Sequence, residues 1–307
     1  MSTSTTTTAS PPGQPVGVGR IIDRTSAPVS RGLPRVVEFR GVAKTYNVGG
    51  PKEFTAIRDV NFFVEDLPEK GEFICVLGPS GCGKSTILRL IAGLPPQHPA
   101  TEGEVLVLGE RVTRPGADRG MVFQDYTSFD HRTVLENITF GLECRGVRRA
   151  EREELGLKWI EHVGLDVAND AHKYPHELSG GMRQRVAIAR TLILRPRIIL
   201  MDEPFGALDP QTRMNMQDLL VSLWHEVHAT VFFVTHSIEE AVFLGDRVYV
   251  MGRAPGTILR ELVLEPADRP ARVMQRDPRF QETVSYIRDL ISQLEEQGNV
   301  KDGGTTS

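Results

Sequence analysis

The sequence predicts an α/β core that is interrupted by a helical insertion. Short apolar runs with strand character alternate with helical segments up to about residue 125, and strand signals return after residue 195. Between these points helical period and propensity dominate, and strand-like runs are scarce. An α/β core with an inserted helical segment is the simplest account of this order.

The expected elements follow one another along the chain without an internal repeat. Expected strands cover residues 36–46, 60–66, 73–78, 103–109, 119–124, 197–204, 229–236 and 246–251. Expected helices cover residues 85–94, 137–146, 148–165, 180–193 and 214–228, where the period and residue types favour helix.

Composition and charge narrow the class of protein. A chain of 307 residues is long enough for one large or two smaller domains with a buried core. Apolar residues make up 40% and charged residues 25%, as in ordinary soluble proteins. Lys and Arg total 36 against 40 Asp and Glu, so the net charge of −4 predicts no nucleic-acid partner.

Targeting signals and cysteines indicate a soluble cytoplasmic protein, with a membrane partner left open. No window approaches the roughly 18 to 20 apolar residues that span a bilayer. The N-terminal segment lacks the basic and apolar regions of a secretory signal. Cys75, Cys82 and Cys144 are odd in number and lack metal-ligand spacing, which fits a reducing compartment.

Both ends of the chain differ from the middle. Residues 1–34 are rich in Thr, Ser, Pro and Gly and are expected to form a disordered tail, because they cannot bury enough surface to fold alone. Residues 261–307 are expected to form a C-terminal extension. Its segment 284–297 reads as one amphipathic helix that packs on the core, and the polar stretch from about 293 is expected to fray.

The stretch GPSGCGKST matches the phosphate-loop pattern G-x-x-x-x-G-K-[ST] between an expected strand and an expected helix. Its glycines permit backbone angles that let N–H groups surround a phosphate. Lys84 is expected to reach the β- and γ-phosphates, and the Ser85 hydroxyl to bind Mg²⁺. A glycine-rich turn that happens to contain lysine is the alternative, and the strand and helix argue against it. The loop comprises Gly78, Pro79, Ser80, Gly81, Cys82, Gly83, Lys84, Ser85 and Thr86.

Cys82 has a distinct expectation because it lies in this loop at a helix N-terminus. The helix dipole there should lower the pKa of its thiol and make it reactive. The alternative is that the loop buries the sulfur, so that alkylation is slow.

The stretch RIILMDEP is an apolar strand that ends in two acids. Asp202 beside a phosphate loop suits Mg²⁺ coordination. Glu203 is then placed to accept a proton from an attacking water. A solvated strand-end turn would be the better interpretation of this segment alone, but not in the company of the phosphate loop.

Three further residues are weak signals individually. Gln124 and His236 each close an expected strand, and ligands of α/β nucleotide sites gather at the carboxyl edge of the sheet. A lone strand-end histidine is more often structural. Tyr46 could stack on adenine or could be a half-buried edge residue.

The stretch LSGGMRQR, Leu178–Arg185, is a second candidate anion site. A serine and two glycines precede a segment that reads as a helix, and such a start offers free N–H groups to an anion. It contains no lysine, and a complete phosphate loop already exists earlier in the chain.

The motifs together resemble those of ABC transporter ATPase subunits, in their order and spacing. The resemblance covers about residues 35–260, with the helical subdomain at about 125–195. It implies a P-loop NTPase (RecA-like) core with an antiparallel β subdomain and an inserted α-helical subdomain, and it implies ATP and Mg²⁺ as cofactors. The motifs that carry it are GPSGCGKST, GMVFQ, LSGGMRQR, RIILMDEP, GALD and VTHS.

The resemblance also implies a role for LSGGMRQR. In that family two ATPase subunits pair head to tail, and each signature motif caps the ATP held by the other subunit's phosphate loop. Ser179, Gly180 and Gly181 would therefore bind the γ-phosphate of the partner's ATP, and no lysine is needed because the opposite loop supplies one.

The other roles implied by the resemblance fall on residues already singled out. Asp202 matches the Walker B acid, Glu203 the catalytic glutamate and His236 the switch histidine that senses the γ-phosphate. Gln124 matches the Q-loop glutamine, which takes part in catalysis and contacts Mg²⁺, and Lys84 the catalytic lysine of Walker A. Asp209 of GALD matches the D-loop aspartate at the dimer seam, and Tyr46 the aromatic A-loop residue.

A narrower resemblance is to the nitrate, sulfonate and taurine group of importer ATPases, through the segments around residues 206–224 and 232–258. It implies the ATP-hydrolysing subunit of an importer for a small anion, at the cytoplasmic face of the membrane. Its partners would be a second ATPase copy, membrane permease subunits and an extracytoplasmic solute-binding protein. A soluble ABC ATPase acting on ribosomes or DNA, and an exporter ATPase, are the alternatives.

Two departures from that group are visible. The segment DYTSFDHRTVLENI lacks the LPW that commonly follows the Q-loop, in the region where a coupling helix of the permease would dock. Ser237 occupies the position where aspartate is usual after the histidine. The first departure leaves the permease and the solute undetermined, and the second leaves the ATPase chemistry intact.

Overall fold

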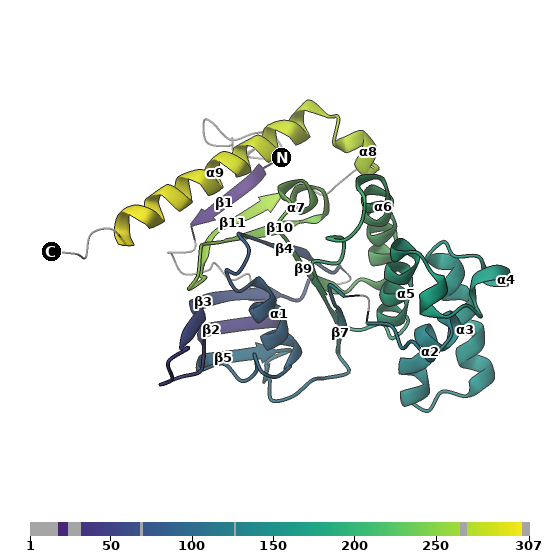
Figure 1. Ribbon diagram of the computed structural model, residues 1–307. Coiled ribbons are helices and arrows are strands. Elements are labelled where there is room, and N and C mark those ends of the chain that lie inside the picture. Colours follow the sequence, from purple (N-terminus) through teal and green to yellow (C-terminus); the bar gives the residue numbers. More distant parts are fainter. Residues whose placement is uncertain (1–17, 24–31, 68–69, 126, 265–268, 303–307) are drawn as a thin grey trace, which may run out of the picture.

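Two β-sheets and an inserted group of helices make up the fold of the computed structural model (Figure 1), which describes residues 18–23, 32–67, 70–125, 127–264 and 269–302. The larger sheet has seven strands and the smaller has four. Helix α1 (Lys84–Ala92) packs between them, with its apolar residues in one core together with strands of both sheets. The inserted helices form a lobe to one side of the sheets.

The larger sheet contains five neighbouring parallel strands with two antiparallel strands at one edge. Because the carboxyl ends of parallel strands meet at one edge of a sheet, the segments that follow these five strands lie close together. In spatial order the strands are β1 (Val18–Asp23), β11 (Ile258–Leu264), β10 (Arg247–Met251), β4 (Phe73–Leu77), β9 (Thr230–Thr235), β8 (Ile198–Asp202) and β7 (Arg119–Val122).

Strand β4 shows why this sheet is buried on both faces. All five of its residues are buried, and alternate side chains point to opposite faces of a strand. Phe73, Cys75 and Leu77 join a core with the helices of one face, whereas Ile74 and Val76 join the core that contains α1. A strand covered on both faces therefore reads as a continuous apolar run rather than as an alternating one.

The smaller sheet is antiparallel throughout. Phe39 and Phe62 stack on neighbouring strands of this sheet with ring centroids 4.6 Å apart. The pairing of Tyr46 with Phe54 extends β3 six residues upstream of the expected start at Val60, because β2 supplies a hydrogen-bonding partner that local pattern does not reveal. The strands are β3 (Phe54–Glu65), β2 (Arg35–Tyr46), β5 (Glu102–Val107) and β6 (Glu110–Arg111).

The helices fall into an inserted group and a group that covers the larger sheet (Figure 1). The inserted group lies between β7 and β8 in the chain: α2 (Val134–Cys144), α3 (Arg149–His162), α4 (Val167–Asp170), the 3-10 turn η1 (Pro175–Glu177) and α5 (Gly180–Leu192). The remaining helices are α6 (Pro210–Val227), α7 (Ile238–Leu244), α8 (Ala271–Met274) and α9 (Pro278–Asp302). The expected α/β core, antiparallel β subdomain and helical insertion are all present.

The N-terminal expectation needs a correction. The segment 18–23 was expected to belong to a disordered tail, yet it forms β1 and pairs antiparallel with β11. Without β1, the outer edge of β11 would leave backbone N–H and C=O groups without strand partners, and β1 satisfies them. The composition of residues 18–23 does not reveal this pairing with β11. The rest of the expected tail lies outside the described residues, apart from 32–34.

The C-terminal extension is more ordered than expected. Helix α9 begins six residues before the expected start at Val284 and continues to Asp302, where a frayed tail was expected. Phe280, Val284 and Ile287 of this helix are buried in the core on the helix-covered face. These contacts stabilise α9 by tertiary packing, which outweighs the polar character of its last turns.

We predict a large difference between two Phe→Ala substitutions. Phe233 is fully buried between Phe73 and Phe205, so Phe233→Ala should lower the free energy of unfolding by about 3–5 kcal/mol. Phe54 is 50% exposed, and Phe54→Ala should change that free energy by about 0.5 kcal/mol or less. Urea denaturation measures both, and equal losses would contradict the core assignment.

Candidate active site

The phosphate loop joins β4 to α1, and two of its glycines adopt backbone angles that other residues rarely take. Gly81 has φ +80° and Gly83 has φ +97°. A Cβ on Gly83 would lie 2.3 Å from Cγ2 of Ile57, so this position excludes side chains for steric reasons as well.

Gly78 serves a different purpose from the one expected of it. Its φ lies outside the left-handed region, and the constraint there is space. A Cβ would lie 3.0 Å from both the Cys82 sulfur and the Met251 carbonyl oxygen. The glycine therefore allows the loop to fold tightly against the end of β10.

Lys84 is the first residue of α1 and its side chain turns back over the loop. Its buried ammonium donates to the carbonyl oxygens of Gly78 at 2.8 Å and Pro79 at 3.0 Å. The Nζ atom lies 4.0 Å from a carboxylate oxygen of Glu203. The cation is thus held at the mouth of the loop, where phosphate oxygens would replace carbonyl oxygens as acceptors.

Ser85 and Asp202 come together from different elements. The Ser85 hydroxyl donates to Oδ1 of Asp202 at 2.7 Å, and the Arg89 guanidinium lies 3.7 Å from Oδ2. Burial raises the pKa of the Asp202 carboxyl, and the Ser85 hydrogen bond and Arg89 oppose that shift. A hydroxyl and a carboxylate oxygen side by side are ligands that suit Mg²⁺.

This pair suits a metal that takes most of its ligands from substrate and water. Among the residues that the structure describes, no three His, Cys, Asp or Glu side chains gather closely enough to hold a metal ion alone. Mg²⁺ is typically bound by one or two protein oxygens together with phosphates and water. Ser85 and Asp202 fit that pattern.

Glu203 and His236 lie next to each other beyond the ends of β8 and β9. The imidazole Nδ1 of His236 is 3.4 Å from Oε2 of Glu203. Glu203 has φ +44°, an unusual angle for a non-glycine residue, and its backbone N–H donates to the Val234 carbonyl at 3.1 Å. Strain of this kind persists where neighbouring structure enforces it and is frequent at functional sites.

Tyr46 and Gln124 lie at the margins of this group. Tyr46 is half-buried, and its hydroxyl is 3.5 Å from the Thr86 hydroxyl at the start of α1. The Lys44 ammonium lies 5.4 Å from the centre of its ring. Gln124 is exposed just beyond the end of β7, beside the strand that carries Asp202.

The start of α5 is exposed and neighbours the start of α6. Ser179 is exposed and caps α5 by accepting from the Met182 N–H at 3.3 Å. A Cβ on Gly181 would lie 3.0 Å from the Thr212 side chain in the first turn of α6, so the two helix starts are neighbours. In the described ranges, no hydrogen bond joins Ser179, Gly180 or Gly181 to the phosphate loop.

Asp209 marks the start of that neighbouring helix. Its carboxylate accepts from the backbone N–H groups of Gln211 and Thr212, each at 3.1 Å. A hydrogen bond from the Thr212 side chain, together with these backbone bonds, lowers the pKa of the exposed acid. Asp209 therefore acts as the N-cap of α6.

The expectation of a reactive Cys82 is wrong. Cys82 is 1% exposed, and burial raises the pKa of its thiol, which outweighs the lowering by Lys84 and by backbone hydrogen bonds. Desolvation disfavours the thiolate more strongly here than the charges and N–H groups of the loop favour it. The alternative, a sulfur buried by the loop, is what the structure shows.

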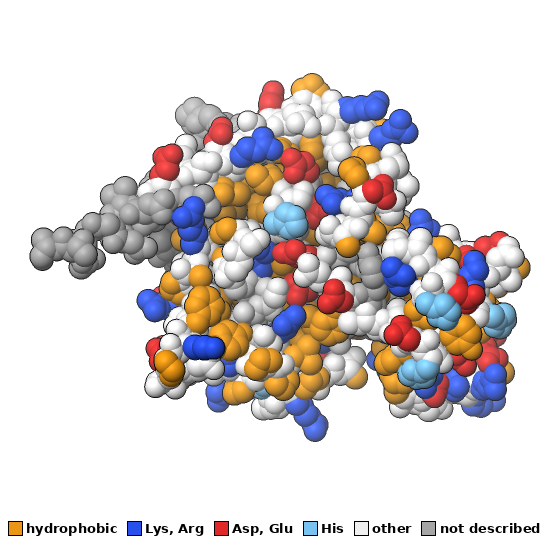
Figure 2. Space-filling model, in the orientation of Figure 1, with side chains coloured by type: hydrophobic (Ala, Val, Ile, Leu, Met, Phe, Trp, Pro, Cys, Tyr) orange, Lys and Arg blue, Asp and Glu red, His pale blue; other side chains and the backbone are white. Residues whose placement is uncertain are grey.

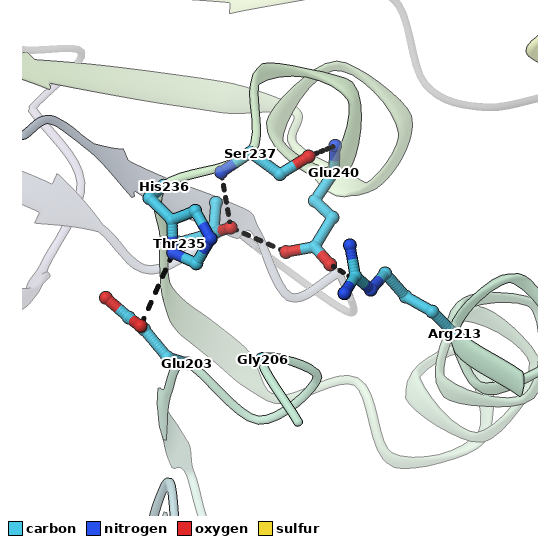
Figure 3. A pocket seen from close by; sticks show the side chains of 7 residues that line it. All are labelled: Glu203, Gly206, Arg213, Thr235, His236, Ser237 and Glu240. Atoms are coloured by element: carbon cyan, nitrogen blue, oxygen red, sulfur yellow. Dashed lines mark hydrogen bonds and ion pairs between the residues drawn. The ribbon is translucent and has the colours of Figure 1, made fainter. Parts of the chain in front are cut away.

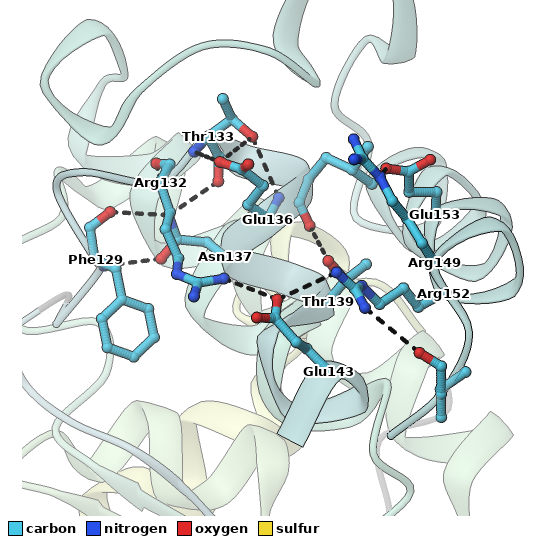
Figure 4. A network of polar contacts seen from close by, with 12 residues as sticks. Phe129, Arg132, Thr133, Glu136, Asn137, Thr139, Glu143, Arg149, Arg152 and Glu153 are labelled. Carbon is cyan, nitrogen blue, oxygen red and sulfur yellow. Dashed lines mark hydrogen bonds and ion pairs between the residues drawn. The ribbon is translucent and has the colours of Figure 1, made fainter. Parts of the chain in front are cut away.

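A buried asparagine that the sequence analysis did not single out fixes the segment after Gln124 (Figure 4). The Asn137 amide accepts from the Phe129 N–H at 2.8 Å and donates to the carbonyls of Phe129, Arg132 and Thr133 at 2.9–3.1 Å. The Thr133 and Glu136 capping box starts the same helix. The T-x-x-E pattern was the available signal for that helix start.

A second missed group surrounds Glu240, behind the segment that carries His236 (Figure 3). A pocket there is lined by Glu203, Gly206, Arg213, Thr235, His236, Ser237 and Glu240. The signal available in the sequence was a carboxylate four residues after His236, on the first turn of a short helix.

The arrangement as a whole is a polar centre at the carboxyl edge of a parallel sheet. Acidic, basic and histidine side chains gather near the middle of the face shown in Figure 2, between the sheets and the inserted helices.

Within the described ranges, every helix is too short or too polar to cross a lipid bilayer.

Comparisons with known proteins decide the family. The family model described as ABC transporter matches residues 60–206. An uncharacterized ABC transporter ATP-binding protein of Methanocaldococcus jannaschii is 47% identical over 265 residues, which are 86% of this chain and 90% of that protein. The chain belongs to the ABC transporter family. It is therefore an ATP-binding and ATP-hydrolysing protein, and the phosphate loop described above is that of an ABC ATPase.

Other relatives and a solved structure agree with this assignment. The nitrate import ATP-binding protein NrtD of Synechocystis is 45% identical and covers 80% of this ABC ATPase, with 91% of its own length matched. The taurine import ATP-binding protein TauB of Rhizobium johnstonii is 47% identical, with 75% and 88% covered. A dimeric ATP-binding cassette in a post-hydrolysis state with ADP and Pi has a TM-score of 0.62 at 34% identity, with 75% of this chain and 99% of that chain covered.

We predict that thiol-alkylating reagents label the native ABC ATPase first at Cys144, which is exposed at the end of α2. Cys82 should react slowly, because burial both blocks access and raises the pKa of its thiol. Labelling followed by peptide mapping measures this. Cys144→Ser should remove the fast phase, and fast labelling of Cys82 in that variant would contradict the prediction.

Proposed function

We propose that this chain is the ATP-hydrolysing subunit of an importer that takes up a small anion of the nitrate, sulfonate or taurine type. The observation that supports it most is the convergence of Lys84, Ser85, Asp202, Glu203 and His236 at one sheet edge. The names of the relatives NrtD and TauB support the import direction and the solute class.

Each residue has a role that follows from its atoms. The Lys84 ammonium pairs with the β- and γ-phosphate oxygens of ATP. Ser85, Asp202 and Gln124 would hold Mg²⁺, which would supply positive charge beside the phosphates. Glu203 accepts the proton of the attacking water, and His236 is placed to contact the γ-phosphate. Tyr46 stacks on the adenine base.

Two copies of the chain share each ATP. Ser179, Gly180 and Gly181 offer the start of α5 to the γ-phosphate bound by the partner's phosphate loop, and Asp209 lies at the seam between the copies. The exposure of Ser179 supports this arrangement, as does the dimeric form of the similar cassette. Helix starts bind anions through backbone N–H groups, so no lysine is required there.

The remaining partners follow from the transport role. The chain works at the cytoplasmic face of the membrane, where permease subunits dock on the helical subdomain near residues 125–137. The Asn137 contacts with Phe129, Arg132 and Thr133 hold residues 129–133 of that segment in place. A solute-binding protein delivers the anion from outside. The acidic balance weighs against a ribosomal or DNA-directed role, while an exporter shares the same nucleotide chemistry.

Glu203→Gln tests the chemistry. The variant should bind ATP but hydrolyse it about a hundredfold more slowly or worse, which is the usual scale for losing a general base. The measurements are phosphate release and ATP affinity in the full-length protein, with thermal unfolding as the control for folding. Turnover at the wild-type rate would remove Glu203 from the role of base.

Ser179→Arg and Lys84→Ala test the shared site when mixed in a Glu203→Gln background. Each shared ATP site combines the phosphate loop of one subunit with the α5 start of the other. In the heterodimer one site therefore contains both substitutions, and the other site contains an unchanged Lys84 and an unchanged Ser179. Sharing therefore predicts partial recovery of ATP-driven dimerisation in sedimentation experiments, whereas each variant alone should fail to dimerise. Absence of recovery at every mixing ratio, with both variants folded, would count against a shared site.

A further inference from the structure

A buried carboxylate lies directly behind the switch histidine. Glu240 is only 6% exposed, on the first turn of α7. Burial raises the pKa of its carboxyl, and hydrogen bonds and the charge of Arg213 oppose that shift. A carboxylate is costly to bury unless its partners hold it, so the partners of Glu240 identify what it fixes in place.

On one side Glu240 fixes the backbone around His236. The Thr235 hydroxyl donates to Oε2 of Glu240 at 2.5 Å, and the same hydroxyl accepts from the Ser237 N–H at 2.9 Å. The Ser237 hydroxyl in turn accepts from the Glu240 N–H at 3.2 Å. These bonds close a ring through the residues before and after His236, and so define the direction in which the imidazole leaves the backbone.

On the other side Glu240 meets the start of α6. Nε of Arg213 lies 3.7 Å from Oε1 of Glu240, and Nη2 of Arg213 donates to the Leu208 carbonyl at 3.0 Å. Leu208 immediately precedes Asp209, the N-cap of α6. Figure 3 shows Arg213 reaching from its helix toward Glu240, with Glu203 and His236 on the opposite side of the same pocket.

We propose that Glu240 is a positioning residue that joins the switch histidine to the loop before α6, through Thr235 on one side and Arg213 on the other. A displacement of Leu208 and Asp209, at the surface assigned above to the second copy, then moves the segment that carries His236. The Arg213–Glu240 pair thus couples binding of the partner subunit to the position of His236 in the active site. This inference rests on the proposed roles of His236 and Asp209.

The alternative is a purely structural role, and the physics of buried ion pairs argues against it. Glu240 is buried, whereas the Arg213 side chain is 32% exposed. Replacing ion pairs that are shielded from water by apolar residues of similar size is often neutral or stabilising, so stability alone does not call for charge at this position. Placement of a catalytic group is different, because a shift of about 1 Å can cost about a hundredfold in rate. Glu240 touches no reacting atom and acts through the neighbours of His236.

The test compares Glu240→Gln with Glu239→Gln in the full-length protein. Glu239 is the adjacent acid, and its carboxylate accepts from the Ser237 hydroxyl and from the Arg288 guanidinium. In the described ranges it has no hydrogen bond or ion pair with Thr235 or Arg213, the two residues through which Glu240 is proposed to act. Glu240→Gln should lower kcat for ATP hydrolysis at least about tenfold and change KM for ATP by less than about twofold, because orientation and not binding is lost. Glu239→Gln should keep the wild-type kcat.

A second series separates coupling from loss of structure. Thr235→Val removes the hydroxyl that Glu240 accepts from while keeping the side-chain volume, and should lower kcat with KM unchanged. Arg213→Gln should do the same. Because Arg213 and Glu240 act as one connection, the double variant Arg213→Gln/Glu240→Gln should be no slower than the slower single variant. Losses of kcat that multiply in the double variant, or a wild-type kcat in Glu240→Gln, would overturn the inference.

The proposed function and this inference fail in different ways. If the wild-type protein does not hydrolyse ATP, or if Glu203→Gln hydrolyses it at the wild-type rate, the proposed function fails. If Glu203→Gln behaves as expected while Glu240→Gln matches Glu239→Gln, only the inference fails.

Discussion

The hydrogen-bond register of the parallel strands is the constraint on which the active site depends. Leu77 at the end of β4 is level with Thr235 at the end of β9, and Asp202 at the end of β8 is level with Val234. The residues that follow therefore emerge at one height along the sheet edge. A slip of one residue would turn side chains to the opposite face and separate the phosphate loop from its acids.

The two cores make that register rigid enough to hold strained residues. Glu203 keeps its positive φ because β8 is buried on both faces and its own N–H is tied to the Val234 carbonyl. Gly83 keeps its turn because β3 presses Ile57 against it. Close-packed surroundings of this kind can impose angles that an isolated segment would leave, and they do so here at the point where the chemistry takes place.

Much of this could be predicted from sequence because the signals were local. The apolar run of β4 followed by GPSGCGKST specifies a buried strand, a loop and a helix within about twenty residues, and RIILMDEP specifies a strand and its acids in the same way. The failures were long-range. The pairing partners of β1 and of the first part of β3, the burial of Cys82 and the full length of α9 depend on residues far away in the chain, whereas the packing of α9 on the core was predicted.

The sequence reveals a buried charged group only where a recognisable motif surrounds it. Burial raises the pKa of both the Asp202 and the Glu240 carboxyl. Asp202 is the last residue of a buried strand in a familiar motif, and the sequence therefore reveals it. Glu240 follows another acid, Glu239, on a short helix, and no motif marks it. Its proposed role lies in the two partners that it joins, Thr235 and Arg213. Since the starts of α5 and α6 are neighbours, the surface that carries Ser179 and Asp209 is continuous with the Arg213 side chain. Contact with a second copy there would act on a group that is already connected to the residues flanking His236.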